Sequence, residues 1–234
     1  MKQESNQNIP RHLGIILDGN RRWAKERNLS SFEGHRQGFE NIKTIGSHAF
    51  ERGIKIMTVF AFSTENWKRS VEEVSYLMGL FKMVAKKELK FLTKHNVKLQ
   101  ISGDISAFDQ ELQTSLNKAM LETAENKKGI FNICLNYGGR EEIVRALKNI
   151  IKAGFKPEEV NQELIANNLY TAGLPDPDLL IRTSGEQRLS GFLTWQSVYS
   201  ELYFTDKHWP EFSKSDLDSA LAVYASRARR FGGN

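Results

Sequence analysis

The chain is built from short apolar runs that each end in a polar or glycine-rich cluster. The runs cover residues 13–17, 54–62, 97–102, 130–135 and 179–181, with a further candidate at 199–204. Short runs rich in β-branched residues are typical of strands buried on both faces of a parallel sheet. Helical periodicity follows several of them, which is the pattern of repeated βα units. The sequence therefore predicts an α/β fold with a mostly parallel central β-sheet flanked by helices.

The clearest predicted helix spans residues 74–92, where apolar side chains recur every three or four positions. Such spacing places them on one face of a helix. Packing of this face on the sheet is the simpler interpretation, and a wall for binding lipid is the alternative. The apolar positions are Val74, Leu77, Met78, Phe81, Val84, Ala85, Leu89 and Leu92.

The first run leads directly into Asp18-Gly19-Asn20 and then into a predicted helix over residues 21–27. Gly19 tolerates a positive φ and close approach of a ligand to the backbone. Arg21 and Arg22 fall in the first helical turn, where positive side chains oppose the helix dipole. That mismatch indicates a bound phosphate, with a divalent cation held beside it on Asp18. An ordinary turn followed by solvated arginines is the alternative interpretation.

Other polar clusters follow the later runs, and ligands of open parallel sheets bind beyond the carboxyl ends of the strands. Arginines at this edge suit bidentate contacts with phosphate oxygens. We expect Asp18 and Glu201 to hold one Mg²⁺, which takes one or two carboxylates together with substrate phosphate. The motifs of common nucleotide-binding, zinc-protease and serine-hydrolase sites are missing from the sequence. The residues expected at this edge are Asp18, Ser63, Glu65, Asn66, Arg69, Arg182, Glu186 and Arg188.

The composition of the chain limits the predictions of where the protein is located and which molecules it binds. The 234 residues contain neither a linker nor a shift in composition, which favours one domain. A net charge of +5 and a pI near 9.2 favour phosphorylated small molecules, an anionic membrane surface or nucleic acid as partners. The single cysteine, Cys134, excludes an intramolecular disulfide and fits a reducing compartment. With neither a signal peptide nor a membrane span in the sequence, we expect a cytoplasmic location, with peripheral contact at the inner membrane face as an option.

Nine motifs stand in order along the chain, at residues 12–24, 34–35, 62–69, 136–140, 176–190, 192–196, 199–204, 209–210 and 229–233. Together they resemble the cis-prenyltransferase (isoprenyl transferase) family, and most closely its undecaprenyl diphosphate synthases. The resemblance covers nearly the whole chain. It implies residues 1–11 as a flexible tail and residues 12–234 as one catalytic domain with an apolar tunnel.

The resemblance also implies a reaction. The family extends an allylic diphosphate, typically farnesyl diphosphate, by cis-condensation with isopentenyl diphosphate, using Mg²⁺ and a homodimer. Long products serve as the carrier lipid for cell-wall glycans. Preorganised positive charge at the departing diphosphate is the largest contribution that such a site makes to the reaction.

Roles for individual residues follow from the same comparison. Asp18 corresponds to the family's essential acid, which acts with Mg²⁺ as the allylic diphosphate leaves, and His35 to a residue that assists this departure. Asn66 completes the expected catalytic set, while Asn20 corresponds to a position near the proton lost from isopentenyl diphosphate. The expected substrate-binding residues in this part of the chain are Gly19, Asn20, Arg21, Arg22, Trp23, Ser31 and His35.

The later motifs correspond to a mobile lid and to a second diphosphate site. Glu73 is the expected hinge of the lid, and Glu201 the second carboxylate near the metal. Residues 229–233 resemble a C-terminal arm that reaches the neighbouring subunit. The expected lid residues are Ser63, Glu65, Asn66, Trp67 and Arg69, and those that bind isopentenyl diphosphate are Arg182, Arg188 and Ser190.

Some positions depart from the family pattern. Ser31 stands where many relatives carry an arginine, so one expected contact with the allylic diphosphate is missing. Ala61 stands where short-chain members carry bulky residues, which favours a long product. The candidates to replace the missing cation are Arg21, Arg27 and Arg36, and the other departures are Ser70, Gly191 and Glu211, which replace a proline, an asparagine and an aspartate.

Three other functions are weighed against this one. A short-chain or branching isoprenyl diphosphate synthase would share the fold. A non-catalytic partner subunit is disfavoured by the presence of Asp18, Arg22, Arg69 and Glu201. A nucleic-acid-binding domain would agree with the basic pI, but the sequence lacks a basic-aromatic recognition motif, so we expect no nucleic-acid partner.

Overall fold

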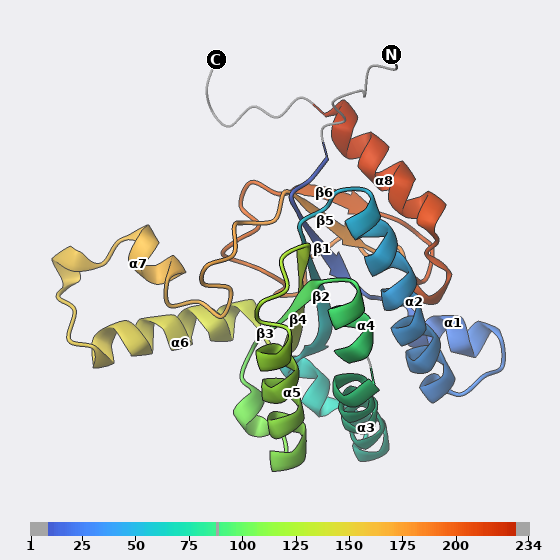
Figure 1. Ribbon diagram of the computed structural model, residues 1–234, viewed down its shortest axis with the longest axis horizontal. Coiled ribbons are helices and arrows are strands. Elements are labelled where there is room, and N and C mark those ends of the chain that lie inside the picture. The colour runs from blue at the N-terminus through green and yellow to red at the C-terminus, as the bar shows by residue number, and fades with distance from the viewer. Residues whose placement is uncertain (1–8, 88, 228–234) are drawn as a thin grey trace.

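The computed structural model describes residues 9–87 and 89–227. Residues 1–8 of the expected tail and the whole of the expected arm at 229–233 lie outside these ranges. One sheet of six strands occupies the centre, in the order β3-β4-β2-β1-β5-β6, and every neighbouring pair is parallel (Figure 1). The predicted single-domain α/β fold is confirmed. The strands are β1 (His12–Ile16), β2 (Ile56–Ser63), β3 (Val97–Ser102), β4 (Gly129–Tyr137), β5 (Leu179–Arg182) and β6 (Glu201–Phe204).

Helices connect and cover these strands. The long helix that follows the first turn begins at Ser31, where the hydroxyl of Ser30 accepts a hydrogen bond from the N–H of Glu33. Such a contact satisfies an orphan donor of the first turn. The helices are α1 (Asn20–Glu26), α2 (Ser31–Glu51), α3 (Val71–Lys87), α4 (Leu89–Lys94), α5 (Gln110–Glu122), α6 (Gly139–Lys152), α7 (Gln162–Ala166) and α8 (Lys214–Ser226).

Two predicted elements have different bounds in the structure. The helix predicted at 74–92 corresponds to α3 and α4, which lie on either side of residue 88, outside the described residues. α3 begins three residues earlier than predicted, because the hydroxyl of Ser70 accepts a hydrogen bond of 3.3 Å from the N–H of Glu73. The last strand begins at Glu201 rather than at residue 199, since Ser200 N–H still donates to Ser197 in the preceding turn.

The two faces of the sheet are covered in different ways. On one face, α2 and α8 pack against Leu13 and Ile15 of β1 to form the largest buried cluster. On the other face, Ile16 packs against Phe192 and Leu193, which lie in an irregular segment. Burial on both faces explains the uninterrupted apolar sequence of β1. Its carboxyl end therefore delivers Asp18 to one edge of the sheet.

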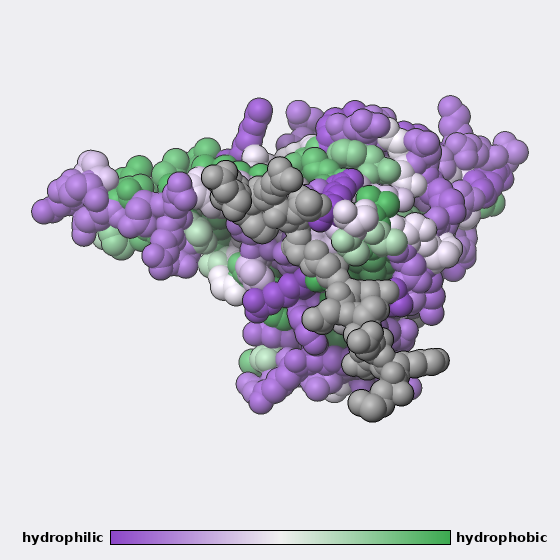
Figure 2. All heavy atoms as spheres, turned by 90° about the horizontal axis from the view of Figure 1, so that it is seen from above, coloured by the Kyte–Doolittle hydropathy of each residue, from purple (hydrophilic) through white to green (hydrophobic). Residues whose placement is uncertain are grey.

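Helices α6 and α7 project away from the sheet (Figure 1). α6 nevertheless has one apolar face, and part of it is exposed in this single chain: hydrophobic side chains gather along the projecting arm in Figure 2. Exposed apolar patches of this kind mark interaction surfaces. The exposed apolar side chains of the arm are Val144, Leu147, Ile151, Phe155 and Val160.

Candidate active site

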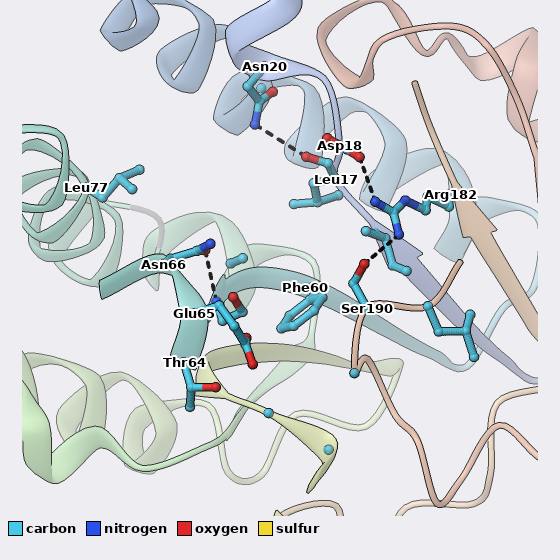
Figure 3. A pocket seen from close by; sticks show the side chains of 18 of the residues that line it. Leu17, Asp18, Asn20, Phe60, Thr64, Glu65, Asn66, Leu77, Arg182 and Ser190 are labelled. Atoms are coloured by element: carbon cyan, nitrogen blue, oxygen red, sulfur yellow. Dashed lines mark hydrogen bonds and ion pairs between the residues drawn. The ribbon is translucent and has the colours of Figure 1, made fainter. Parts of the chain in front are cut away.

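Two adjoining cavities open at the carboxyl edge of the sheet. The larger, of about 1010 Å³, lies beyond β1, β2, β4 and β5 (Figure 3). The smaller, of about 720 Å³, lies beside α1. Asp18 and Arg69 line both cavities, as do Leu17, Asn20 and His35. The expected site residues on the larger wall are Asp18, Asn20, His35, Ser63, Glu65, Asn66, Arg69, Arg182 and Ser190, and the smaller adds Gly19, Arg21, Arg22 and Ser31.

Asp18 lies between two guanidinium groups. Its Oδ1 is 3.1 Å from Nη2 of Arg22, and its Oδ2 accepts a 2.9 Å hydrogen bond from Nη2 of Arg182. Burial acts to raise the pKa of Asp18, but the hydrogen bonds from Arg182 and Arg22 outweigh it and lower the pKa overall. The carboxylate is therefore ionised at neutral pH.

The turn after Asp18 requires glycine. Gly19 has φ +104°, and a Cβ there would lie 2.7 Å from both Ser184 and His208. Helix α1 then packs closely on α2, where a Cβ on Gly38 would lie 2.2 Å from Oδ1 of Asn20. Tight packing on both sides fixes the first turn of α1 at the rim of the smaller cavity.

A second charged cluster lies where α2 meets α3. Glu73 is only 7% exposed; it accepts hydrogen bonds from Nε2 of His35 at 3.0 Å and from Nη1 of Arg69 at 2.9 Å, and Arg21 lies 3.7 Å away. Burial lowers the pKa of His35, and the nearby Arg69 lowers it further, against the opposing effect of Glu73. The ring is therefore neutral at neutral pH, with its one proton on Nε2 toward Glu73 and Nδ1 left as an acceptor.

A third cluster surrounds Arg182, which is buried at the end of β5. Besides Asp18, its guanidinium contacts the hydroxyl of Ser190 at 2.8 Å and the carbonyl oxygen of Arg188. Glu186 links this cluster to α1, because its carboxylate pairs with both Arg188 and Arg22. Arg188 itself points its side chain outward and is 61% exposed.

The segment after β2 is a 3₁₀ helix, η1 (Thr64–Lys68), closed by its own cap. Oδ1 of Asn66 accepts from the N–H of Ser63 at 3.0 Å, so the expected lid is ordered in this conformation. Trp67 points away from the cavities: its indole N–H donates to Asn136 at 2.8 Å, and its ring contacts Phe62. Trp23 likewise packs under the guanidinium of Arg27. Neither tryptophan lines the two cavities in this conformation, and their contact with substrate stays a prediction.

The structure separates Asp18 and Glu201, which the sequence analysis placed on one metal ion. Glu201 is the first residue of β6 and is in register with Leu179 and Leu13, at the amino ends of β5 and β1. Asp18 lies five residues beyond Leu13, which is about 15 Å along the strand direction. Glu201 instead pairs with Arg227 at 2.7 Å. Within one chain, the joint site is therefore wrong.

The cavities also contain residues that the sequence analysis missed. Lys25 lines the smaller cavity, one helical turn after Arg21, and the spacing along α1 was the available signal. Arg140 and Glu141, in the first turn of α6, line the larger cavity. Of the candidates for the missing cation, Arg21 lines the smaller cavity, whereas Arg27 pairs with Glu211 and Arg36 with Glu33.

An apolar cavity of about 70 Å³ continues from the larger one. The two share Phe39 and Ile42, and the apolar cavity extends beneath α2 to Val97 and Lys128 at the amino ends of β3 and β4. The arginine-lined cavity at the carboxyl edge thus adjoins an apolar cavity that reaches the amino ends of β3 and β4. Within the described residues, no helix is both long and apolar enough to cross a membrane.

Arginine-rich cavities around an ionised carboxylate, continued by an apolar channel, suit an amphiphile with an anionic head, and the relatives identify the class as a prenyl transferase. The family model described as "Putative undecaprenyl diphosphate synthase" matches residues 16–232. The chain belongs to this family.

Curated relatives and solved structures agree with this family assignment. The isoprenyl transferase of Clostridium tetani is 47% identical over 97% of this chain and 90% of its own length. The ditrans,polycis-undecaprenyl-diphosphate synthase of Legionella pneumophila, named as specific for (2E,6E)-farnesyl diphosphate, is 43% identical over 97% of both chains. Lavandulyl diphosphate synthase from Lavandula x intermedia, solved with dimethylallyl diphosphate, superposes with a TM-score of 0.92, at 38% identity over 96% of this chain and 98% of that one. A probable undecaprenyl diphosphate synthase from Campylobacter jejuni gives 0.81, at 30% identity over 96% and 99%.

Proposed function

We propose that this enzyme condenses isopentenyl diphosphate onto an allylic diphosphate, with farnesyl diphosphate as the primer, and releases a long Z-polyprenyl diphosphate. The observation that carries the proposal is Asp18, held between Arg22 and Arg182 where the two cavities meet. Each guanidinium belongs to a different cavity wall, so two diphosphates fit on opposite sides of one carboxylate.

The smaller cavity is the proposed site of the allylic diphosphate. Arg21, Arg22 and Lys25 supply positive charge there, and the first turn of α1 faces the same space. The larger cavity accepts isopentenyl diphosphate through Arg182 and Ser190, with Arg188 turning inward from the rim. The allylic C–O bond breaks with its electron pair on the departing diphosphate. The new C–C bond then forms, and the isopentenyl unit loses a proton, which an oxygen of the departed diphosphate accepts.

Mg²⁺ fits this site through Asp18. The carboxylate is ionised and faces the cavity, and Mg²⁺ takes one or two carboxylates together with phosphate oxygens. In the part of the chain that the structure describes, no group of three or more carboxylate, histidine or cysteine side chains is placed so that it could hold a metal ion. We therefore propose that substrate oxygens complete the coordination. When bound, the ion neutralises charge on the departing diphosphate.

His35 and Asn66 act on either side of Asp18 in this proposal. Glu73 fixes the neutral ring of His35 by accepting its Nε2 proton, which leaves Nδ1 as a hydrogen-bond acceptor at the rim where the diphosphate departs. Asn66 holds Ser63 through its amide oxygen, which leaves the amide N–H₂ free to bind substrate. Closure of this segment over the bound substrates excludes water from the allylic cation.

The apolar cavity receives the growing chain. At about 70 Å³ it holds roughly the volume of two water molecules, so elongation requires α3 to move away from α2. Ala61 lines the larger cavity at the start of this path and leaves it open. The apolar product also favours release at the inner face of the membrane by an otherwise cytoplasmic enzyme.

A homodimer is the proposed assembly. The exposed apolar face of α6 presents Val144, Leu147 and Ile151 at helical spacing, with Ile151 74% exposed. A second copy would cover this surface by two-fold symmetry.

The test is elongation in vitro. Purified protein with Mg²⁺, farnesyl diphosphate and radiolabelled isopentenyl diphosphate should give a ladder of long products on reversed-phase chromatography. Absence of any elongation would overturn the proposal. Efficient use of dimethylallyl diphosphate with a single condensation would identify a short-chain or branching synthase, to which the lavandulyl diphosphate synthase fold similarity points. Calorimetry without Mg²⁺-dependent binding of isopentenyl diphosphate would identify a non-catalytic subunit.

A further inference from the structure

His208 bridges the segment after β5 to α1, directly behind the diphosphate turn. Its Nδ1 lies 2.6 Å from the hydroxyl of Ser184, and its Nε2 lies 2.9 Å from Oε1 of Glu26. The side chain is only 14% exposed. The ring is thus held at both nitrogens, by residues that are far from it in the sequence.

This bridge forms the floor beneath Gly19. A Cβ at Gly19 would lie 2.7 Å from Nδ1 of His208 and 2.7 Å from the hydroxyl of Ser184. The backbone of the turn therefore rests on these two side chains. Displacement of either one changes where the N–H groups of the turn point.

Ser184 joins the bridge to both diphosphate cavities. It follows Arg182 by two residues, has the left-handed φ of +77°, and offers its carbonyl oxygen to Nη1 of Arg22 at 3.0 Å. Such a φ is uncommon outside glycine and persists only when neighbouring contacts hold it. The contacts here are the N–H donated to Lys207 and the hydroxyl bound to His208.

The segment around His208 also holds Asp18. The carbonyl oxygen of Asp18 accepts hydrogen bonds from the N–H of Trp209 at 3.0 Å and from the hydroxyl of Thr183 at 2.7 Å. Trp209 follows His208 and Thr183 precedes Ser184. The chain neighbours of both residues therefore hold Asp18, which directly precedes Gly19.

The hydrogen-bond chemistry defines the ring's tautomer. The hydrogen bond to His208 lowers the pKa of Glu26, so this carboxylate is ionised and only accepts. A ring that donates from Nε2 to this carboxylate leaves Nδ1 to accept from the hydroxyl of Ser184 when the ring is in its neutral form. Side chains without an acceptor at the Nδ1 position lose this contact.

We propose that His208, through its contact with Ser184, is a positioning residue that sets the Gly19 turn and Arg22 for the allylic diphosphate. The inference rests on the proposed function. It predicts that loss of the Ser184 contact weakens allylic diphosphate binding and leaves the chemical step nearly unchanged.

The experiment compares three variants with the full-length enzyme. His208→Leu removes both contacts, while His208→Asn keeps an amide oxygen near the position of Nδ1. Glu26→Gln is the matched control at the other nitrogen, because it keeps an acceptor on an exposed side chain. Steady-state kinetics give KM for farnesyl diphosphate and kcat, and calorimetry measures binding of the unreactive farnesyl thiolodiphosphate.

We expect His208→Leu to raise KM and the calorimetric Kd about three- to tenfold, the effect of one lost hydrogen bond, with kcat within about twofold. His208→Asn should recover most of the affinity, and Glu26→Gln should resemble the wild type. Equal losses for the Leu and Asn variants, or unchanged affinity in both, would overturn the inference.

A second comparison covers the case in which His208→Leu does not fold. Ser184→Ala removes the other partner, and in a cycle with His208→Ala, which also removes the contact, the two effects should be non-additive. Additive effects would contradict the proposed coupling. If the wild type binds the thiolodiphosphate but elongates nothing, the proposed function fails while the binding ratios still decide the role of His208.

Discussion

Asp18 and Arg182 are 164 residues apart in the chain, yet Oδ2 of one accepts a 2.9 Å hydrogen bond from Nη2 of the other. The contact exists because β1 and β5 are parallel neighbours, with Ile16 in register with Arg182. It joins the turn that follows the first strand to the cluster that contains Ser190. The two proposed diphosphate sites are therefore parts of one rigid edge, and their separation does not depend on a flexible loop.

Asp18→Asn should lower kcat by about 10²–10³-fold or more, because it removes the charge that holds the metal and orients both guanidinium groups. The amide keeps the size of the side chain, so circular dichroism should report an intact fold. Turnover within tenfold of the wild type in the radiolabel assay would contradict the role given to Asp18.

Arg21→Gln should raise KM for farnesyl diphosphate about three- to tenfold, because Arg21 lines the smaller cavity, which contains Ser31. The effect should shrink at high salt, since the side chain is 61% exposed. Arg27→Gln is the matched control, because Arg27 pairs with Glu211 outside the cavities. Equal KM changes in both variants would reject Arg21 as the replacement for the missing arginine.

Ala61→Phe should shorten the product, because Ala61 lines the start of the path to the apolar cavity. Chain lengths are measured by reversed-phase separation of the radiolabelled products. KM for farnesyl diphosphate should change little, as the diphosphate site is elsewhere. An unchanged product ladder would place the growing chain on a different path.

Ile151→Glu should convert a dimer into a monomer, since a charge on the exposed face of α6 cannot be buried without a large cost. Light scattering coupled to size exclusion measures the mass. Leu121→Glu on α5 is the control, as Leu121 is 77% exposed on another helix. A monomeric wild type would remove the proposed dimer altogether.

Stability should fall as the pH drops below about 6.5, the ordinary pKa of histidine. Burial lowers the pKa of His12, against its hydrogen bond to Pro175, and burial likewise lowers the pKa of His35. The unfolded chain therefore takes up protons at a higher pH than the folded protein, and the loss continues until the folded-state pKa values are reached. Asp18 and Glu73 have lowered pKa values, so their contribution is lost at a lower pH, as the pH falls from the ordinary carboxylate range through their folded-state pKa values.

Urea unfolding at pH 7.5, 6.5 and 5.5 measures this change as a shift in midpoint at constant slope. His12→Asn should lower the midpoint at every pH, because it disrupts the buried contacts with Thr58 and Pro175, yet it should flatten the dependence on pH. A wild-type midpoint that is the same at all three values would refute the prediction.

Much of the fold was predictable because its signals are local. The run that became β1 is buried on both faces, and such burial requires an uninterrupted apolar sequence. Asp18, Arg22 and Arg69 were likewise recognisable, since they follow the carboxyl ends of predicted strands. The start of α3 at Val71 and the start of β6 at Glu201 were missed, because element ends depend on caps and turns that periodicity does not report.

Trp67 shows a second limit of prediction from the sequence, which concerns the contacts of a single side chain. Its place in the motif after β2 suggested contact with substrate, but its N–H reaches Asn136 at the end of β4 instead. A polar group on a half-buried indole takes the hydrogen-bond partner that the neighbouring strand supplies. Which strand is the neighbour is a property of the sheet order, and residues 62–69 alone carry no information about it.

The sequence by itself determined the parallel sheet, the acid and arginines at its carboxyl edge, and the family, because each is written in contiguous residues. Only the tertiary structure decided which of those groups meet. Asp18 contacts Arg182 and is separated from Glu201, although β5 and β6, which carry these two residues, lie on the same side of β1 in the strand order. The reason is physical: contact between strands depends on their order and register, and the packing of the whole chain selects both.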